Sequence, residues 1–289
     1  MSPSRRVALL VALVTVTACA SSPPPFVPPK EEPGAPKMLL AMVLLSEARL
    51  PDPTRLVRAF ERFDGRPTDE AFEPAAPDEA TIAVSLEGVG TGFVGLMPIA
   101  VPGGEADSAA DFSAQRLGSE DRPLAPHSAH LIVSLQLDEP DAAASDLSTF
   151  TSFVAAVAET TPSVGVYWGA GGVTHDRRFF LERAADDALA SRVLLWFGVT
   201  LAEEDADRMS FMSHGMAQLD QPELLLGVRK AAAGDGAETF FSILAYLADH
   251  GSAFGDGDTV GFDEATRWKV HYVPSPTDPS AQACRIDLP

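Results

Sequence analysis

The feature that most constrains the fold of this chain is the order of basic, apolar and small residues at its N-terminus, because that order bears on where the folded part begins. Arg5 and Arg6 precede an apolar run from Val7 to Val16, which is shorter than the roughly 20 residues that a membrane-spanning helix needs. Small residues follow and lead to Cys19. This order of basic, apolar and small residues is typical of a secretory signal. We therefore expect the folded part to begin after this segment, in an exported protein.

The last four residues of the signal, Val16-Thr17-Ala18-Cys19, resemble the bacterial lipobox. At that motif a dedicated peptidase cuts before the cysteine, and the sulfur carries diacylglycerol. The resemblance implies a signal peptide over residues 1–18 and a mature chain held at the membrane by acyl chains such as palmitate on Cys19. Lipoproteins retained at the inner membrane commonly have aspartate after the cysteine. Ala20 stands there in this chain, so the resemblance favours the outer membrane of the cell envelope. A plain signal peptide cut elsewhere and an uncleaved N-terminal anchor are the alternatives.

The cysteine content then limits how the exported part is stabilised. With Cys19 used by lipid, Cys284 has no partner for an internal disulfide, although exported proteins fold where disulfides can form. The fold must depend on its hydrophobic core, which about 250 residues can supply. Cys284 lies in a polar, proline-containing tail, where we expect an exposed thiol that is idle or forms an intermolecular disulfide.

The charge of the chain excludes one class of partner. Its formal net charge is −20, and removing the first 18 residues, which contain two arginines and no acid, makes it −22. An acidic surface repels nucleic acid and anionic lipid headgroups, so we expect no nucleic-acid partner and a membrane affinity that comes from the acyl chains. The acidity serves solubility in the simplest interpretation, and a basic partner or divalent counterions are the alternatives.

The distribution of proline divides the mature chain into three parts. Residues 19–37 form a proline-rich linker, which favours an extended chain of about 3.1 Å per residue and a reach of roughly 50 Å from the lipid surface. Residues 38–273 form one globular domain, which we expect to resist proteolysis as a unit. Residues 274–289 are predicted to be an irregular tail.

The globular region alternates between patterns typical of strands and of helices. Asp52 and Pro53 mark the start of one helix, and Asp176 can cap another. Further helices are expected near 106–112, over 147–157 and over 238–248. The strands are expected at Met38–Leu45, Thr81–Leu86, Gly92–Ala100, His130–Leu135, Val164–Trp168, Val193–Leu201, Glu223–Val228 and Trp268–Val273.

These elements predict an α+β fold in which helices pack on a mixed, mainly antiparallel sheet. Two similar cycles of a buried strand, an acidic-proline turn and an amphipathic helix start at Met38 and Ala129. The cycles allow a degenerate duplication of two strand-helix-strand halves. Unrelated proteins share the same features, so both interpretations stay open.

Four short motifs carry a further resemblance. They are similar to segments of a bacterial family catalogued as domain of unknown function 4261, over about residues 38–273. That family has no established activity, so the resemblance implies a fold family and transfers no catalytic residue. The motifs are Ala129-His130-Leu131-Ile132-Val133, Gly165-Val166-Tyr167-Trp168, His214-Gly215-Met216 with Gln221-Pro222-Glu223, and Gly257-Asp258-Thr259-Val260-Gly261.

Three residues of these motifs are the candidates for a binding groove: His130, Trp168 and His214. Each lies at or beside the end of an expected strand, where side chains often gather around a ligand. A histidine that titrates near neutrality can serve in acid–base catalysis. A core histidine with satisfied hydrogen bonds is the alternative. The chain has no Gly-x-Ser-x-Gly elbow and no His-Glu-x-x-His pair, so we predict no catalytic residue by motif.

Metal binding has one weak signal. His127 and His130 have a spacing that can chelate a metal, but zinc takes three or four ligands. His175, His214 or an acid would complete the set only through the fold. A polar entry to a buried strand is the simpler interpretation, and we expect no metal and no cofactor.

Three other segments are interpreted as structural. Gly169-Ala170-Gly171-Gly172 lacks the spacing and the lysine of a phosphate-binding loop, so we expect a tight strand-to-helix turn. Asp256-Gly257-Asp258 has too few carboxylates for a calcium loop and is expected to be a turn. Glu203-Glu204-Asp205 is expected to be a solvated loop.

The leading functional hypothesis is a lipid-anchored envelope protein whose acidic domain binds an unknown protein or small-molecule ligand without turning it over. The main alternative is an envelope hydrolase or metal-dependent enzyme with its site near His130, Trp168 and His214. An accessory factor of a stress response or a secretion system is a third hypothesis.

The anchor gives the first testable prediction. Replacing Cys19 by serine should abolish lipid labelling and leave an unprocessed precursor, because the cysteine sulfur is the acyl acceptor. Mass spectrometry of the mature protein checks this result. An unmodified Cys19 inside a longer mature chain would contradict the prediction.

Overall fold

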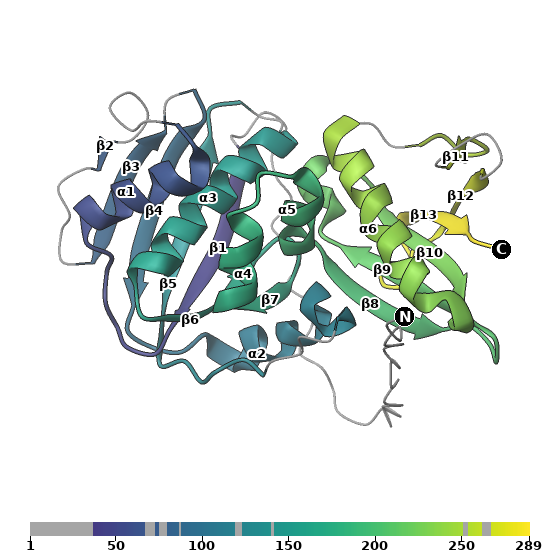
Figure 1. The fold of residues 1–289 in the computed structure, drawn as a ribbon, viewed down its shortest axis with the longest axis horizontal. Coiled ribbons are helices and arrows are strands. Elements are labelled where there is room, and N and C mark those ends of the chain that lie inside the picture. Colours follow the sequence, from purple (N-terminus) through teal and green to yellow (C-terminus); the bar gives the residue numbers. More distant parts are fainter. Residues whose placement is uncertain are drawn as a thin grey trace, which may run out of the picture. The chain divides into compact units, whose positions relative to one another are not determined.

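The computed structural model describes residues 37–66, 73–74, 80–86, 88–118, 123–139, 142–250, 254–261 and 267–289 (Figure 1). The predicted signal peptide, Cys19 and the linker up to residue 36 lie outside the described residues. Within the described part, helices pack on two mostly antiparallel sheets, so the predicted α+β class is confirmed. None of the described helices is both long enough and apolar enough to cross a membrane.

The first sheet has the strand order β2-β3-β4-β5-β1-β6-β7, and every pair of neighbours is antiparallel. Strands β3 and β4 form the hairpin that the sequence predicted. Strand β1 is central, which agrees with its continuous apolar sequence. The bounds are β1 (Met38–Leu45), β2 (Glu73–Pro74), β3 (Thr81–Leu86), β4 (Gly90–Met97), β5 (Ala129–Leu137), β6 (Ser163–Trp168) and β7 (Val173–Asp176).

Two strand-helix-strand units, one starting at β1 and one at β5, are interleaved in this sheet. Helix α1 (Pro53–Asp64) follows β1, and the chain re-enters the sheet as a hairpin whose β4 lies one strand away from β1, beyond β5. Helix α3 (Ala144–Thr160) connects β5 to β6 across β1 in the same way. The order β4-β5-β1-β6 with this connectivity is the split β-α-β arrangement of ferredoxin-like folds.

Helices α1, α3, α4 (Arg177–Ala184) and α5 (Leu189–Trp196) cover one face of the first sheet (Figure 1). Helix α1 starts as predicted, because the Asp52 carboxylate accepts a hydrogen bond from the Arg55 backbone N–H (2.9 Å) next to Pro53. Asp176 caps α4 in the same way through the N–H groups of Arg178 and Phe179. Local sequence therefore places both helix starts.

A buried arginine holds the ends of these helices together. The guanidinium of Arg192 in α5 donates to the backbone carbonyls of Phe63 (3.2 Å), Ser148 (2.8 Å) and Ala184 (3.3 Å). Two of these carbonyls lie in the last turns of α1 and α4, where no helical N–H is left to satisfy them. Burial lowers the pKa of Arg192, and the nearby carboxylates of Asp187, Asp64 and Asp186 act in the opposite direction.

The other face of the first sheet is covered over part of its area by α2 (Glu105–Ala109) and by the short turns η2 (Ala110–Phe112) and η3 (Ala114–Leu117). A small apolar cluster lies under α2. Its buried members are Leu44, Val101, Ala106, Ala109 and Tyr167.

The second sheet has the strand order β11-β12-β13-β10-β9-β8. Strands β10 and β13 are parallel and the other neighbours are antiparallel, so this sheet is mixed. Helix α6 (Ala233–His250) packs on β9 and β10 and also contacts α5. The bounds are β8 (Gly198–Glu203), β9 (Arg208–His214), β10 (Glu223–Arg229), β11 (Thr259–Val260), β12 (Trp268–Pro274) and β13 (Gln282–Asp287).

One cluster of buried apolar side chains continues through both sheets. It joins Phe60 in α1 and Phe153 in α3 to Trp196 in α5, and then to Phe211 in β9 and Phe240 in α6, all at most 2% exposed. Fully burying one such side chain stabilises a fold by about 1.5–3 kcal/mol. The two sheets therefore share a core, and the prediction of one sheet is corrected to two sheets on one core.

The predicted strand over Val193–Leu201 is wrong in its first half. Residues Leu189–Trp196 form α5, and β8 begins only at Gly198. A short apolar run does not distinguish a buried helix from a buried strand. Here Val193 and Trp196 face the core three residues apart, which is helical spacing.

The predicted irregular tail over 274–289 is also wrong. Strand β13 lies there between β10 and β12, paired with both. Cys284 is in this strand and is 3% exposed, so the expected exposed thiol is corrected to a buried one. Burial raises the pKa of Cys284 to about 11, which keeps it a neutral, poorly reactive thiol.

Candidate functional site

The structure places two of the predicted groove residues on opposite faces of the first sheet. Trp168 packs between Phe150 and Phe180 on the helix-covered face, with ring centroids 5.1 and 6.5 Å away. His130 precedes Leu131, which belongs to that same helix-side core, so the His130 side chain points to the other face. Both are buried, at 1% and 3% exposure. They do not share a groove.

His130 is held by a single internal hydrogen bond among those that the structure describes. Its Nδ1 lies 2.9 Å from the backbone carbonyl oxygen of Ile99, just after β4. A carbonyl can only accept, so Nδ1 donates the proton. The ring therefore ties the segment after β4 to β5.

His214 ends β9 in the second sheet and is partly exposed. Its Nε2 shares a hydrogen bond with the hydroxyl of Thr200 on β8 (2.6 Å), and its ring lies 5.7 Å from that of Phe112. Burial lowers the pKa of His214, so the neutral ring is favoured. His214 therefore connects β9 to β8 and packs against the turn η2.

Gln218 connects Trp168 to the segment that follows His214. It lies in η4 (Met216–Leu219), and its Oε1 accepts a hydrogen bond from Trp168 Nε1 (3.1 Å). Its Nε2 donates to the carbonyls of Gly215 (2.8 Å) and Trp196 (3.1 Å). Each polar atom of this buried amide thus has a partner, and the amide links the first sheet to the second.

Three glycines meet beside Gln218, and we call Gly171, Gly198 and Gly215 the glycine junction. A Cβ on Gly198 would lie 2.6 Å from the Gly171 carbonyl oxygen, and one on Gly215 would lie 2.8 Å from Gly171 Cα. A Cβ on Gly171 would in turn clash with the Trp196 carbonyl. Gly215 also has φ +106°, which side chains rarely tolerate. The three backbones approach so closely because none carries a side chain.

The turn that carries Gly215 is held by Glu223. Its carboxylate accepts hydrogen bonds from the Ser213 hydroxyl (2.5 Å) and from the N–H groups of Gly215 (2.8 Å) and Met216 (3.2 Å). Burial raises the pKa of Glu223, and the three donors act in the opposite direction. The Glu223 carboxylate therefore stabilises this turn through three hydrogen bonds.

His127 and His175, which were considered as metal ligands, also make internal hydrogen bonds. His127 Nε2 accepts a hydrogen bond from the Val101 N–H (3.1 Å). His175 is fully buried, where Nε2 donates to the Leu195 carbonyl (3.2 Å) and Nδ1 accepts from the Ser113 hydroxyl (2.7 Å). Among the described residues, no three histidines, cysteines or acids are grouped so that they could hold a metal ion.

The three segments that were predicted to be turns or loops can be compared with the structure. Gly169–Gly172 is a tight turn, but it joins β6 to β7 and not a strand to a helix. Asp256–Asp258 is the predicted turn, with Gly257 at φ +86°. Glu204 and Asp205 lie exposed in the loop after β8 as predicted, Glu203 is the last residue of β8, and Glu204 also forms an ion pair with Arg285 of β13 (2.9 Å).

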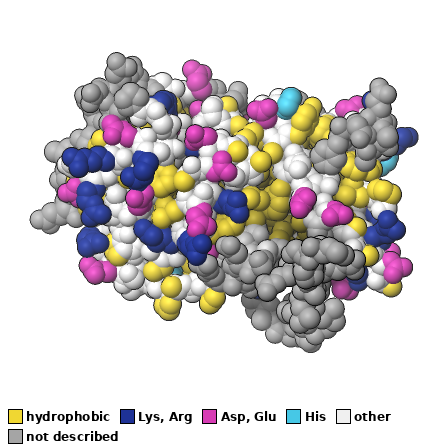
Figure 2. All heavy atoms as spheres, in the orientation of Figure 1, with side chains coloured by type: hydrophobic (Ala, Val, Ile, Leu, Met, Phe, Trp, Pro, Cys, Tyr) yellow, Lys and Arg dark blue, Asp and Glu magenta, His cyan; other side chains and the backbone are white. Residues whose placement is uncertain are grey.

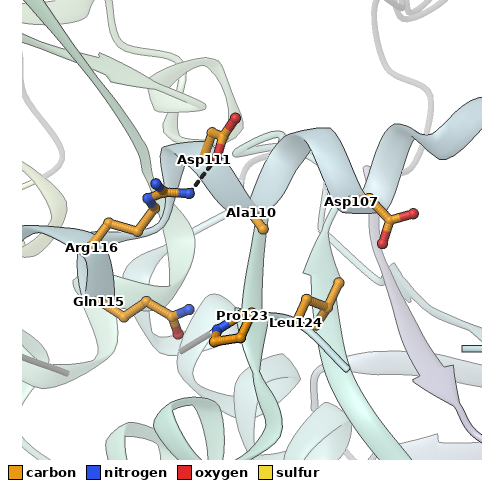
Figure 3. Close-up of a pocket in the computed structure, with 7 residues that line it drawn as sticks. All are labelled: Asp107, Ala110, Asp111, Gln115, Arg116, Pro123 and Leu124. Carbon is orange, nitrogen blue, oxygen red and sulfur yellow. Dashed lines mark hydrogen bonds and ion pairs between the residues drawn. The ribbon is translucent and has the colours of Figure 1, made fainter. Parts of the chain in front are cut away.

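A cavity of about 380 Å³ opens beside α2 and the turns η2 and η3 (Figure 3). Figure 3 shows Arg116 paired with Asp111 on its wall. The volume lies at the small end for ligand pockets. None of the predicted groove residues contributes to its lining, which consists of Asp107, Ala110, Asp111, Gln115, Arg116, Pro123 and Leu124.

The comparison with known families agrees with part of the expected resemblance. Residues 212–287 match the family described as Domain of unknown function (DUF4261). The match contains the His214-Gly215-Met216 motif and Glu223, and it continues through β13. The motifs around His130 and Trp168 lie outside the matched residues. No curated protein and no solved structure shows significant similarity to the chain.

Gln218 and Gly198 were not among the predicted site residues, and the sequence did not show how the motifs are connected in space. The signal available was the closeness of His214-Gly215-Met216 and Gln221-Pro222-Glu223, since two motifs so near each other indicate a shaped turn. Gly198 stands inside an apolar run and gives no local signal. Its role depends on Gly171, which is distant in sequence and adjacent in space.

The glycine junction gives the second prediction. Gly171→Ala and Gly198→Ala should each lower the free energy of unfolding by about 1–3 kcal/mol, because the added methyl group meets backbone that cannot move aside. Urea unfolding followed by circular dichroism measures the change. Gly234→Ala in α6 is the matched control, because a Cβ there meets nothing within 4 Å. It should be neutral or slightly stabilising. Equal effects at all three sites would contradict the close approach.

His175 gives the third prediction. Burial lowers its pKa from 6.5 to about 4, so the folded state resists the proton that the unfolded state accepts. The stabilisation is complete above about pH 6.5 and is lost as the pH falls toward 4. Between pH 7 and pH 5 the loss should be about 2 kcal/mol. Thermal unfolding at both pH values measures it. In His175→Gln, which retains a donor and an acceptor, this part of the pH dependence should disappear; an unchanged slope would contradict the assignment.

Proposed function

We propose that this chain is a lipid-anchored protein of the bacterial cell envelope whose α+β domain binds a partner and does not catalyse a reaction. The observation that supports this proposal most directly is that the candidate catalytic side chains make hydrogen bonds within the protein. One ring nitrogen of each residue makes an internal hydrogen bond: His130 Nδ1 with the Ile99 carbonyl, Trp168 Nε1 with Gln218 and His214 Nε2 with Thr200. A general base has to lie within reach of a substrate proton.

The anchor and the charge support the location. The order Arg5, Arg6, apolar run and lipobox-like Val16-Thr17-Ala18-Cys19 favours export and acylation, and Ala20 favours the outer membrane. A net charge of −20 disfavours nucleic acid as the partner. A domain tethered to a membrane surface is suited to capturing a partner there, since its effective concentration near that surface is high.

The alternative of an envelope hydrolase or metal-dependent enzyme requires His130, Trp168 and His214 to surround one substrate. His130 and Trp168 face opposite sides of the first sheet, and His214 lies in the second. A hydrolase built on these three residues would need a rearrangement of both sheets, so the geometry favours the binding role.

The proposal predicts that these histidines contribute to stability. His130→Ala should lower the free energy of unfolding by about 1–3 kcal/mol, because it removes a buried ring together with its hydrogen bond to the Ile99 carbonyl. His214→Ala should have a smaller effect, because that residue is partly exposed. His271→Ala is the control, since the His271 side chain is 56% exposed, and it should change stability by less than about 0.5 kcal/mol.

Differential scanning calorimetry measures the three variants. Catalytic residues are often suboptimal for stability, so their removal leaves the melting temperature unchanged or raises it. A melting temperature that does not fall in His130→Ala and His214→Ala would therefore favour the enzyme alternative.

A further inference from the structure

The face of the first sheet that α2 leaves uncovered carries a group of exposed apolar side chains. We call this the open face and define it by the exposed Met38, Phe93 and Met97 together with the half-buried Met42 and Ile132, of which Met42 also packs against the apolar cluster under α2. Met38, Phe93 and Met97 are 61%, 39% and 37% exposed, and Ile99, just after β4, is 52% exposed. The register aligns them across strands, because Phe93 pairs with Ser134 and Gly95 pairs with Ile132, which pairs with Met42.

The open-face positions on β1, β3, β4 and β5 carry no Asp, Glu, Lys or Arg, whereas Glu73 of β2, at the edge of the sheet, pairs with Ser85. An antiparallel sheet with one solvated face normally alternates apolar and polar residues. By contrast, the helix-covered side carries interspersed basic and acidic side chains, which Figure 2 shows over α1. The open-face positions on β1, β3, β4 and β5 are Met38, Leu40, Met42, Thr81, Ala83, Ser85, Thr91, Phe93, Gly95, Met97, His130, Ile132, Ser134 and Gln136.

Acidic side chains lie at both ends of this neutral area. Asp138 and Glu139 follow directly on β5 and are exposed. At the other end, Glu105 and Asp107 are exposed on α2, where Glu105 accepts a hydrogen bond from Tyr167 (2.6 Å). An apolar area bounded by carboxylates, on a chain of charge −20, complements a partner that is apolar on one side and basic at its margins.

A second copy of the chain fits this surface poorly. Stacking two open faces would bring two sets of these carboxylates together between chains that already repel each other. Methionine-rich surfaces, in contrast, adapt to the apolar side of amphipathic helices. Strands β1 and β4 have eight residues each, or about 26 Å, which matches a helix of about 18 residues.

We propose that the open face binds the apolar side of a basic amphipathic helix of a partner protein. The helix would form a third layer, on the side of the sheet opposite α1 and α3, in the way that helices ordinarily cover a sheet. This inference deepens the proposed binding role and assigns it a surface and a partner chemistry.

The test uses the full chain carrying Cys19→Ala, so that no acyl chain competes for the apolar surface. The probe is a labelled 18-residue peptide of leucine and lysine with all leucines on one helical face. Its control is the same peptide with glutamate in place of lysine. Fluorescence anisotropy measures binding to the Cys19→Ala chain, to the same chain with Phe93→Ser and Met97→Ser, and to the same chain with Leu201→Ser. Leu201 is 45% exposed on β8, outside the open face, and serves as the matched control.

We expect the lysine peptide to bind, with the affinity at least tenfold lower in the Phe93→Ser, Met97→Ser chain and unchanged in the Leu201→Ser chain. The glutamate peptide should not bind. Equal binding to all three chains, equal binding of both peptides, or no binding would overturn the proposal. Self-association that is lost with Phe93→Ser and Met97→Ser would also overturn it, in favour of a second copy. None of these outcomes bears on Cys19 acylation or on the stability of the histidine variants, so the two proposals fail separately.

Discussion

The structure depends on the close approach of three backbone segments at the glycine junction. Gly171 belongs to the β6–β7 turn of the first sheet, Gly198 begins β8 and Gly215 follows β9. Side chains at these positions would hold the two sheets apart, because the contacts are with backbone atoms and not with the flexible ends of side chains. Once the segments meet, Gln218 can reach both Trp168 and the Trp196 carbonyl, and the core can continue from Phe153 to Phe240.

The same constraint explains why polar side chains at buried strand ends have structural roles. Joining two sheets on one core buries strand ends, and buried strand ends carry polar atoms that need partners. His175 satisfies the Leu195 carbonyl, and Glu223 satisfies two backbone N–H groups of the turn beside it. Histidine and glutamate suit such positions, since they combine several hydrogen-bonding atoms with a compact side chain.

Local patterns in the sequence predicted the elements whose causes are local. The Asp52 and Asp176 caps, the β3–β4 hairpin and the buried strand β1 follow from neighbouring residues, and each is confirmed. Elements whose state depends on distant partners were missed. Strand β13 has a polar, proline-flanked sequence and becomes a strand only because β10 and β12 offer edges on both sides. Helix α5 resembles a strand until α3 and α6 are placed against it. The groove of His130, Trp168 and His214 was inferred from strand ends, but alternation along a strand decides which face a side chain takes.

The extent of the family match can be understood from the same contacts. Residues 212–287 contain the last residues of β9 together with β10, α6, β12 and β13, which is most of the second sheet with the helix that covers it. That segment includes Gly215 and Gln218, whose partners Gly171 and Trp168 lie in the first sheet, outside the match. The atoms that a Cβ on Gly215 would meet belong to Ala170 and Gly171, and the tryptophan that the Gln218 amide bonds lies in β6, so both residues make contacts outside the matched segment. Their presence inside the segment indicates that the second sheet is adapted to a neighbour of this kind. A segment with this motif would accordingly need a turn without side chains opposite Gly215 in order to fold as it does here.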